Sequence, residues 1–120
     1  MLSTGFRAWA PVVLWAAVIF AFSSVPSLGT GLGTWDLVLR KLAHVAEYAV
    51  LGALLVRALA RPELAILLGA LYAVSDEIHQ HFVPGRHGVW YDVLIDTAGV
   101  AAGVVAWTRW RAGAPGAGAD

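Results

Sequence analysis

The sequence predicts an all-α protein, an integral membrane bundle of four transmembrane helices. Hydrophobic residues make up 59% of its 120 residues and charged residues 13%, whereas soluble domains have roughly 45–50% and about 25%. The mean hydropathy, +0.71, is correspondingly high. Four apolar segments approach the ~20 residues that cross a bilayer, and Pro- and Gly-containing breakers separate them. A soluble helical bundle is excluded because these helices would have almost no polar face for water.

The first apolar segment, Ala8–Phe22, is uncharged and directly follows Arg7. A cleaved signal peptide is the alternative interpretation of this start, but no convincing A-x-A cleavage site follows it. The other three segments are each 18 or 19 residues long: Leu42–Ala60, Glu63–Gln80 and Val89–Trp107. The breakers between segments are Pro26 with Gly29, Gly31 and Gly33, then Pro62, then Pro84-Gly85.

Composition also limits the partners and the domain organisation. Eight basic and eight acidic side chains give a formal net charge of zero. The chain therefore lacks the excess of positive charge that binds nucleic acid, and nucleic acid is not expected as a partner. Cysteine is absent, which excludes disulfides, thiolate metal sites and cysteine nucleophiles. A single domain is expected over residues 1–111, followed by a disordered Gly/Ala/Pro tail over residues 112–120.

The basic residues predict the orientation of the four segments. If the chain starts inside the cell, three basic residues lie outside, namely Arg40, Lys41 and Arg86, and five lie in the cytoplasm, namely Arg7, Arg57, Arg61, Arg109 and Arg111. Basic residues concentrate on the cytoplasmic side of membrane proteins. We therefore expect a multi-pass protein of the cytoplasmic membrane with both termini in the cytoplasm.

Most of the other polar residues fall at one depth in this topology, on the outer side. They lie at the end of segments one and three and at the start of segments two and four: Ser23, Ser24, Asp36, His44, Glu47, Tyr48, Asp76, Glu77, His79, Gln80, Asp92 and Asp96. Ionisable groups within a membrane are costly and mark functional sites. The sequence therefore predicts a polar, charged pocket in the outer half of the bilayer, in which acids and bases compensate one another.

Helical spacing predicts which side chains of this set share a face. Lys41, His44 and Tyr48 lie on one face of segment two, with Glu47 at its edge. On segment three the shared face has Tyr72, Asp76, His79 and Gln80, and on segment four it has Asp92, Asp96, Gly99 and Gly103. Gly99 and Gly103 also form a small-x-x-x-small pattern, which either allows close helix packing or arises by chance in so Gly-rich a chain.

Several chemistries fit these residues. His44 and Glu47 suit a proton-transfer pair, part of a metal site, or a hydrogen bond that secures the helix start. Asp76 and Glu77 are adjacent, so their side chains diverge by about 100° and only one of them is expected to be central. No local ligand spacing such as H-E-x-x-H is present, so no metal or cofactor is predicted.

The chain is similar to the VanZ-like family of small bacterial membrane proteins over about residues 17–103. The matching motifs are Phe22-Ser23-Ser24-Val25-Pro26, Lys41-Leu42-Ala43-His44 with Glu47-Tyr48, and the stretch Tyr72-Ala73-Val74-Ser75-Asp76-Glu77-Ile78-His79-Gln80-His81-Phe82-Val83-Pro84-Gly85-Arg86, followed by Asp92, Asp96 and Gly99. Two positions depart from the family's pattern: Arg40 stands where an aspartate is usual, and Asp96 stands where an asparagine is common.

The resemblance implies a place in the cell envelope, because the family's namesake is an accessory factor associated with lowered susceptibility to teicoplanin. It implies no settled reaction. The partner we expect is a membrane lipid or a lipid-linked envelope precursor. In the first hypothesis the pocket binds an anionic or phosphorylated head group, with Lys41 and Arg86 as the anion contacts. The full set of ligand-binding candidates is Lys41, Glu47, Tyr48, Gln80, Arg86, Asp92 and Asp96.

The second hypothesis is an enzyme that acts on a lipid-linked substrate at the outer leaflet. Asp76 or Glu77 would be the general base and His44 or His79 would shuttle protons, while Arg86 would orient the anionic substrate. Alternatively, Arg86 forms a salt bridge to a nearby carboxylate. A proton or ion pathway is the least favoured function, because the inner half of the chain contains no polar relay.

Overall fold

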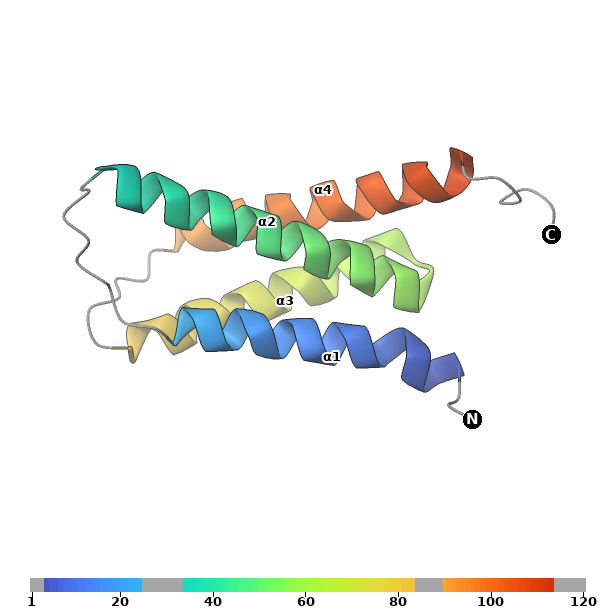
Figure 1. Cartoon of the computed structure of the whole chain (residues 1–120), viewed down its shortest axis with the longest axis horizontal. Coiled ribbons are helices and arrows are strands. Elements are labelled where there is room, and N and C mark those ends of the chain that lie inside the picture. Colours follow the sequence, from blue (N-terminus) through green and yellow to red (C-terminus); the bar gives the residue numbers. More distant parts are fainter. Residues whose placement is uncertain (1–3, 25–33, 84–89, 114–120) are drawn as a thin grey trace.

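The computed structural model describes residues 4–24, 34–83 and 90–113. Four helices account for nearly all of them (Figure 1): α1 (Thr4–Ser23), α2 (Thr34–Leu59), α3 (Pro62–His81) and α4 (Tyr91–Gly113). These described residues contain no β-strand. The prediction of an all-α fold with four helices is therefore confirmed.

Helices α2 and α4 extend furthest beyond the apolar segments that predicted them. Helix α2 starts at Thr34 instead of Leu42, and α4 continues from Trp107 to Gly113. The added residues mix polar, charged and apolar types. Charged residues such as Asp36, Arg40 and Arg109 interrupt the apolar pattern there, although the helix continues. At 26 residues, α2 is about 39 Å long.

Two of the four helices qualify as membrane spans by length and composition. The candidate spans are Gly5–Ser23 in α1 and Val38–Leu59 in α2. Helix α3 has 20 residues and α4 has 23, so both are about 30 Å or longer. However, α3 carries three acids, and α4 carries two acids and two arginines. The structure therefore supports two candidate membrane spans, in α1 and α2, and the crossing of the membrane by α3 and α4 stays a prediction.

A tight turn between α2 and α3 makes these two helices antiparallel neighbours (Figure 1). Ala60 has φ of 56°, in the left-handed region, and its amide donates to the Val56 carbonyl at 2.8 Å, which closes α2. Arg61 is extended, as expected before a proline, and Pro62 begins α3 where its missing N–H costs nothing.

Helix α2 is at the centre of the bundle and packs against each of the other three helices. Its closest neighbour is α4, because glycines remove the side chains between the two backbones. A Cβ on Gly103 would collide with the Ala49 carbonyl, and one on Gly99 would lie 2.8 Å from the Val45 carbonyl oxygen. The small-x-x-x-small pattern of α4 is therefore a packing motif.

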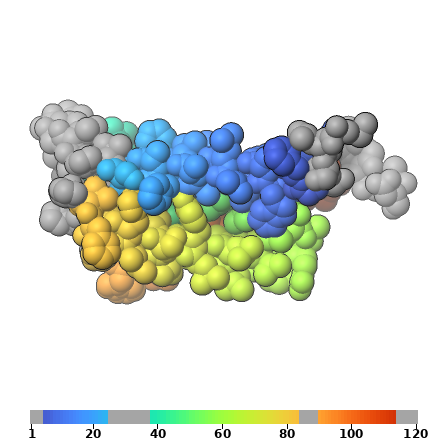
Figure 2. Space-filling view, turned by 90° about the horizontal axis from the view of Figure 1, so that it is seen from below, coloured from blue at the N-terminus to red at the C-terminus, as the bar shows by residue number. Residues whose placement is uncertain are grey.

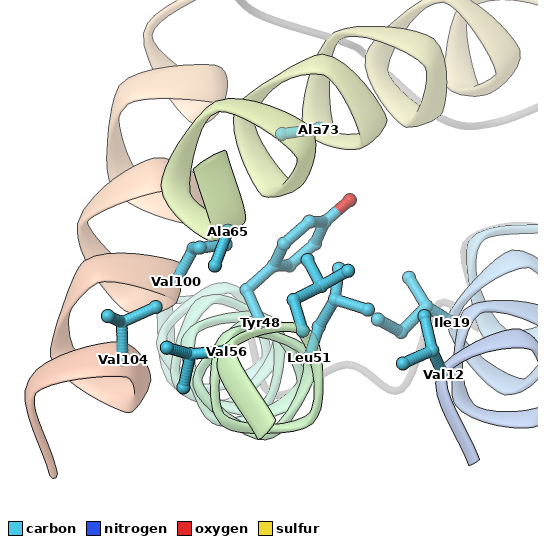
Figure 3. Packing of buried hydrophobic residues seen from close by; sticks show 10 residues of the cluster. Val12, Ile19, Tyr48, Leu51, Val56, Ala65, Ala73, Val100 and Val104 are labelled. Carbon is cyan, nitrogen blue, oxygen red and sulfur yellow. The ribbon is translucent and has the colours of Figure 1, made fainter. Parts of the chain in front are cut away.

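The apolar core fills the space around α2 (Figure 3). Tyr48 lies near its middle, fully buried, with its hydroxyl pointing toward α3. The other fully or almost fully buried apolar side chains come from all four helices: Ile19, Leu51, Ala65, Ala73, Val100 and Val104. Close packing of side chains from every helix around α2 fixes the positions of the helices relative to one another.

The helix ends form two separate regions at opposite ends of the bundle (Figure 1). We call one the polar end; it contains the end of α1, the start of α2, the end of α3 and the start of α4. We call the other the arginine end; it contains the start of α1, the α2–α3 turn and the end of α4, with Arg7, Arg57, Arg61, Arg109 and Arg111.

Large apolar side chains cover much of the outer surface. Helices α1 and α3 lie side by side on the face shown in Figure 2. Leu14 on α1 is 70% exposed, and Phe20, Leu67 and Leu71 on these two helices are also exposed. Many large apolar side chains exposed on neighbouring helices are typical of proteins covered by lipid or by a partner.

Candidate functional site

A chain of hydrogen bonds joins α2 to α3 at the polar end. Within α2, His44 Nδ1 lies 3.0 Å from Glu47 Oε2. The other ring nitrogen, Nε2, lies 3.1 Å from the Gln80 side-chain nitrogen on α3. That amide also approaches Asp76 Oδ2 at 3.4 Å, and Tyr48 donates its hydroxyl to the same oxygen at 2.8 Å. We call these five residues the polar cluster.

The contacts of the polar cluster fix the orientation of the His44 ring. Its Nδ1 faces the Glu47 carboxylate and its Nε2 faces the Gln80 side-chain amide. The neutral tautomer with the proton on Nδ1 satisfies both contacts, with Nδ1 donating to Glu47 and Nε2 accepting from the Gln80 amide nitrogen. His44 Nε2 faces α3 near Asp76, whose Oδ2 is 4.0 Å away.

Asp76 is the most deeply buried acid of the cluster. Its side chain is 2% exposed, and its second carboxylate oxygen, Oδ1, has no hydrogen-bond partner among the described residues. Glu77 Oε1 and Ser23 Oγ are also buried at this end without a hydrogen bond to any part of the chain that the structure describes. Buried unsatisfied polar atoms cost stability and are uncommon in folded proteins. Their concentration here marks the polar end as a candidate site.

A separate ion pair ties α2 to α4 nearer the surface. Lys41 Nζ donates to Asp92 Oδ1 at 2.7 Å, with the two side chains 35% and 18% exposed. The same ammonium lies 5.6 Å from the centre of the Tyr91 ring. Lys41 is therefore engaged by its own chain and only partly available to an anionic ligand.

The structure separates His79 from Asp76 and Gln80, with which the sequence grouped it. His79 faces α1, where its Nε2 lies 2.9 Å from Ser24 Oγ and its ring stacks on Phe20. Gln80 is one residue further along the helix and turns toward α2, because successive side chains diverge by about 100°. Glu77 lies at the edge of the site, with Oε1 3.8 Å from His81 Nε2.

Two other predicted site residues lie outside the hydrogen-bonded chain. Asp96 is buried on α4, with 4% exposure. Arg86 falls outside the described residues, so its role as an anion contact stays a prediction. Within the described ranges no three His, Asp or Glu side chains come together in a way that could hold a metal ion.

The acids and bases of the polar end are unequal in number. By sequence position this end has three basic residues, Arg40, Lys41 and Arg86, and six acids: Asp36, Glu47, Asp76, Glu77, Asp92 and Asp96. The arginine end has the five remaining arginines and Glu63 as its described acid. Although the net charge of the chain is zero, the polar end has an excess of acids and the arginine end an excess of bases. The acids of the polar end are therefore not fully compensated by its bases, unlike in the predicted pocket.

Three polar contacts of α1 were missed by the sequence analysis. Trp15 Nε1 donates to the Glu47 carbonyl at 2.8 Å, Tyr72 donates to the Ala16 carbonyl, and Ser24 meets His79. The signal in the sequence was a Trp and a Tyr inside apolar helices, since their N–H and O–H groups require partners when buried. These bonds attach α1 to the helices that carry the polar cluster.

The fold and the cluster together define an all-helical protein with two candidate membrane spans and buried polar groups at one end. A family model described as VanZ/LLP1 matches residues 6–111 of the chain, so the chain belongs to the VanZ/LLP1 family. The resemblance read from the sequence motifs is confirmed. No curated protein and no solved structure matches the chain. Family and apolar helices agree in indicating a membrane protein.

Proposed function

We propose that the protein crosses the cytoplasmic membrane four times, with both termini inside, and binds the polar head group of an envelope lipid or lipid-linked envelope precursor at its polar end. The role is that of an accessory protein of the cell envelope. Four antiparallel helices of about 30 Å or more and a largely apolar outer surface support the four spans. The five arginines of the arginine end support the orientation.

The observation that carries this proposal is the polar cluster with its unsatisfied oxygen. A chain of hydrogen bonds runs from the half-buried Glu47 and His44 to the buried Gln80 and Asp76, and it ends on a carboxylate oxygen without a partner in the described residues. In a membrane such groups are costly unless a ligand or water completes them. Asp76 Oδ1 is an acceptor, so it suits a hydroxyl, amide or ammonium donor of a head group.

The excess of acids determines where a phosphate of the same lipid would bind. Carboxylates repel an anion, so a phosphorylated head group would contact the cations at the surface of the site. Lys41, which is 35% exposed, and Arg86 are the two predicted contacts. The hydroxyl or amide donors of the head group would then face the buried acceptors of the polar cluster.

Native mass spectrometry of the detergent-purified protein tests this function. The wild-type chain is expected to retain an envelope lipid, and Asp76→Asn and His44→Ala are expected to lose it, because each removes an acceptor from the cluster. Ser75→Ala is the matched control, since Ser75 is adjacent to Asp76 but exposed. Equal lipid retention in all four proteins would reject the polar end as the binding site.

A membrane enzyme acting on a lipid-linked substrate is the second candidate function. It is favoured by His44, whose orientation Glu47 fixes and whose Nε2 faces the buried Asp76. In this function Asp76 or Glu77 is the general base, and His44 or His79 carries protons. Release of phosphate from lipid-linked phosphates is the assay. Activity that persists unchanged in Asp76→Asn, Glu77→Gln, His44→Ala and His79→Ala would rule out this chemistry.

A further inference from the structure

We propose a second lipid site at the arginine end, a groove that binds the phosphate of an anionic phospholipid from the adjacent leaflet. It lies between the end of α2, the start of α3 and the end of α4, and its volume is about 530 Å³. Ligand sites in proteins commonly measure about 300–1,000 Å³. The groove shares no residue with the polar end, so it can be tested separately, but its place beside the cytoplasmic leaflet rests on the membrane topology proposed above.

Two arginines supply the charge of the groove. Arg57 on α2 and Arg111 on α4 both line it, and both are exposed. Neither forms an ion pair with any residue in the described part of the chain. No acid is among the lining residues. A guanidinium group binds phosphate through two parallel hydrogen bonds, so an unpaired pair of arginines matches a phosphate in charge and geometry.

Apolar and aromatic walls distinguish a lipid from a small soluble anion as the occupant. Trp107 and Trp110 lie beside the arginines, with ring centres 5.2 Å apart, and Val56 and Pro62 also line the groove. Indole rings favour the interface between head groups and acyl chains. A ligand that matches both the arginines and the apolar walls of the groove has a phosphate attached to an apolar chain. Anionic lipids of the cytoplasmic leaflet have this chemistry, and basic pockets between helices are known to bind them.

The chain offers a matched pair of double variants for the test. Arg57→Gln/Arg111→Gln removes both groove arginines, while Arg61→Gln/Arg109→Gln removes two charges from the same end without touching the groove lining. Purified proteins are titrated with phosphatidylglycerol or phosphatidylcholine, and the bound lipid is measured by native mass spectrometry. We expect the groove variant to bind phosphatidylglycerol at least about tenfold more weakly than the wild type, and the control variant to bind it within about twofold.

The expected results separate a site from a general attraction to charge. Equal losses in both double variants would overturn the proposal, since net charge alone would then explain binding. Equal affinity of the wild type for the two lipids would also overturn it. Trp110→Leu keeps both arginines and removes an exposed ring, so it is expected to fold and to weaken phosphatidylglycerol binding. Unchanged binding in Trp110→Leu would reject the aromatic wall and with it the lipid site.

Discussion

The polar end and the arginine end use charge in opposite ways. At the polar end Asp76, Glu77 and Asp96 are buried between helices, and Asp76 is bonded to side chains of α2 and α3. At the arginine end Arg57 and Arg111 are exposed beside two tryptophans. Burial between helices limits the acids to partners that reach into the bundle, whereas the exposed arginines are accessible from outside it. The two ends therefore offer different chemistry, buried acceptors at one and exposed donors at the other.

The contact between α2 and α4 lies between these two ends, and breaking it should have the largest effect on stability. Gly103→Ala places a methyl group against the Ala49 backbone carbonyl, so the helices must move apart. We expect a loss of about 2–3 kcal/mol in the free energy of unfolding. Gly113→Ala on the same helix meets no atom within 4 Å and is expected to change it by less than about 0.5 kcal/mol. Thermal unfolding in detergent measures both, and equal midpoints would contradict the close packing of α2 and α4.

Removal of one hydroxyl from the polar end should have the next largest effect. Tyr48→Phe deletes the 2.8 Å bond to Asp76 and leaves that buried carboxylate with still fewer partners. We expect a destabilisation of about 1–2 kcal/mol, since an unsatisfied buried group carries its desolvation cost. Tyr91→Phe is the control, because Tyr91 is 45% exposed. If both variants unfold at the wild-type temperature, the hydrogen bond from Tyr48 to Asp76 does not stabilise the fold.

The surface pair at the polar end should contribute least. A double-mutant cycle with Lys41→Met and Asp92→Asn is expected to give a coupling energy of about 0.2–1 kcal/mol, because both side chains are partly exposed. The coupling should decrease as salt is added, since exposed charges are screened. A coupling energy above about 2 kcal/mol that does not change with salt concentration would show that this pair behaves as a buried ion pair.

Apolar periodicity was sufficient to predict the four helices and their order. It missed the first turns of α2 and the last turns of α4, because residues such as Asp36 and Arg109 interrupt an apolar pattern without breaking a helix. The family motifs were recognisable because Ser75-Asp76-Glu77 and His79-Gln80-His81 occur together in one stretch.

Periodicity located the polar end but did not resolve its partners. It placed Asp76, His79 and Gln80 on one face of α3, whereas in the bundle Gln80 turns toward α2 and His79 toward α1. A helical face about 100° wide spans two neighbouring helices, so spacing alone cannot assign the partner. The close approach of α4 to α2 depends on backbone contacts at Gly103, which a single sequence only suggests.

Sidedness of the two ends tests the central claim, that all four helices cross the membrane and the polar end faces outward. The chain has no cysteine, so Phe82→Cys and Ala112→Cys each create one thiol, at exposed positions of the polar end and the arginine end. A membrane-impermeant maleimide is applied to right-side-out membrane vesicles. Four spans predict labelling of Phe82→Cys in intact vesicles and of Ala112→Cys only after permeabilisation. If only α1 and α2 cross the membrane, both thiols lie inside, and protection of Phe82→Cys until permeabilisation would contradict the account.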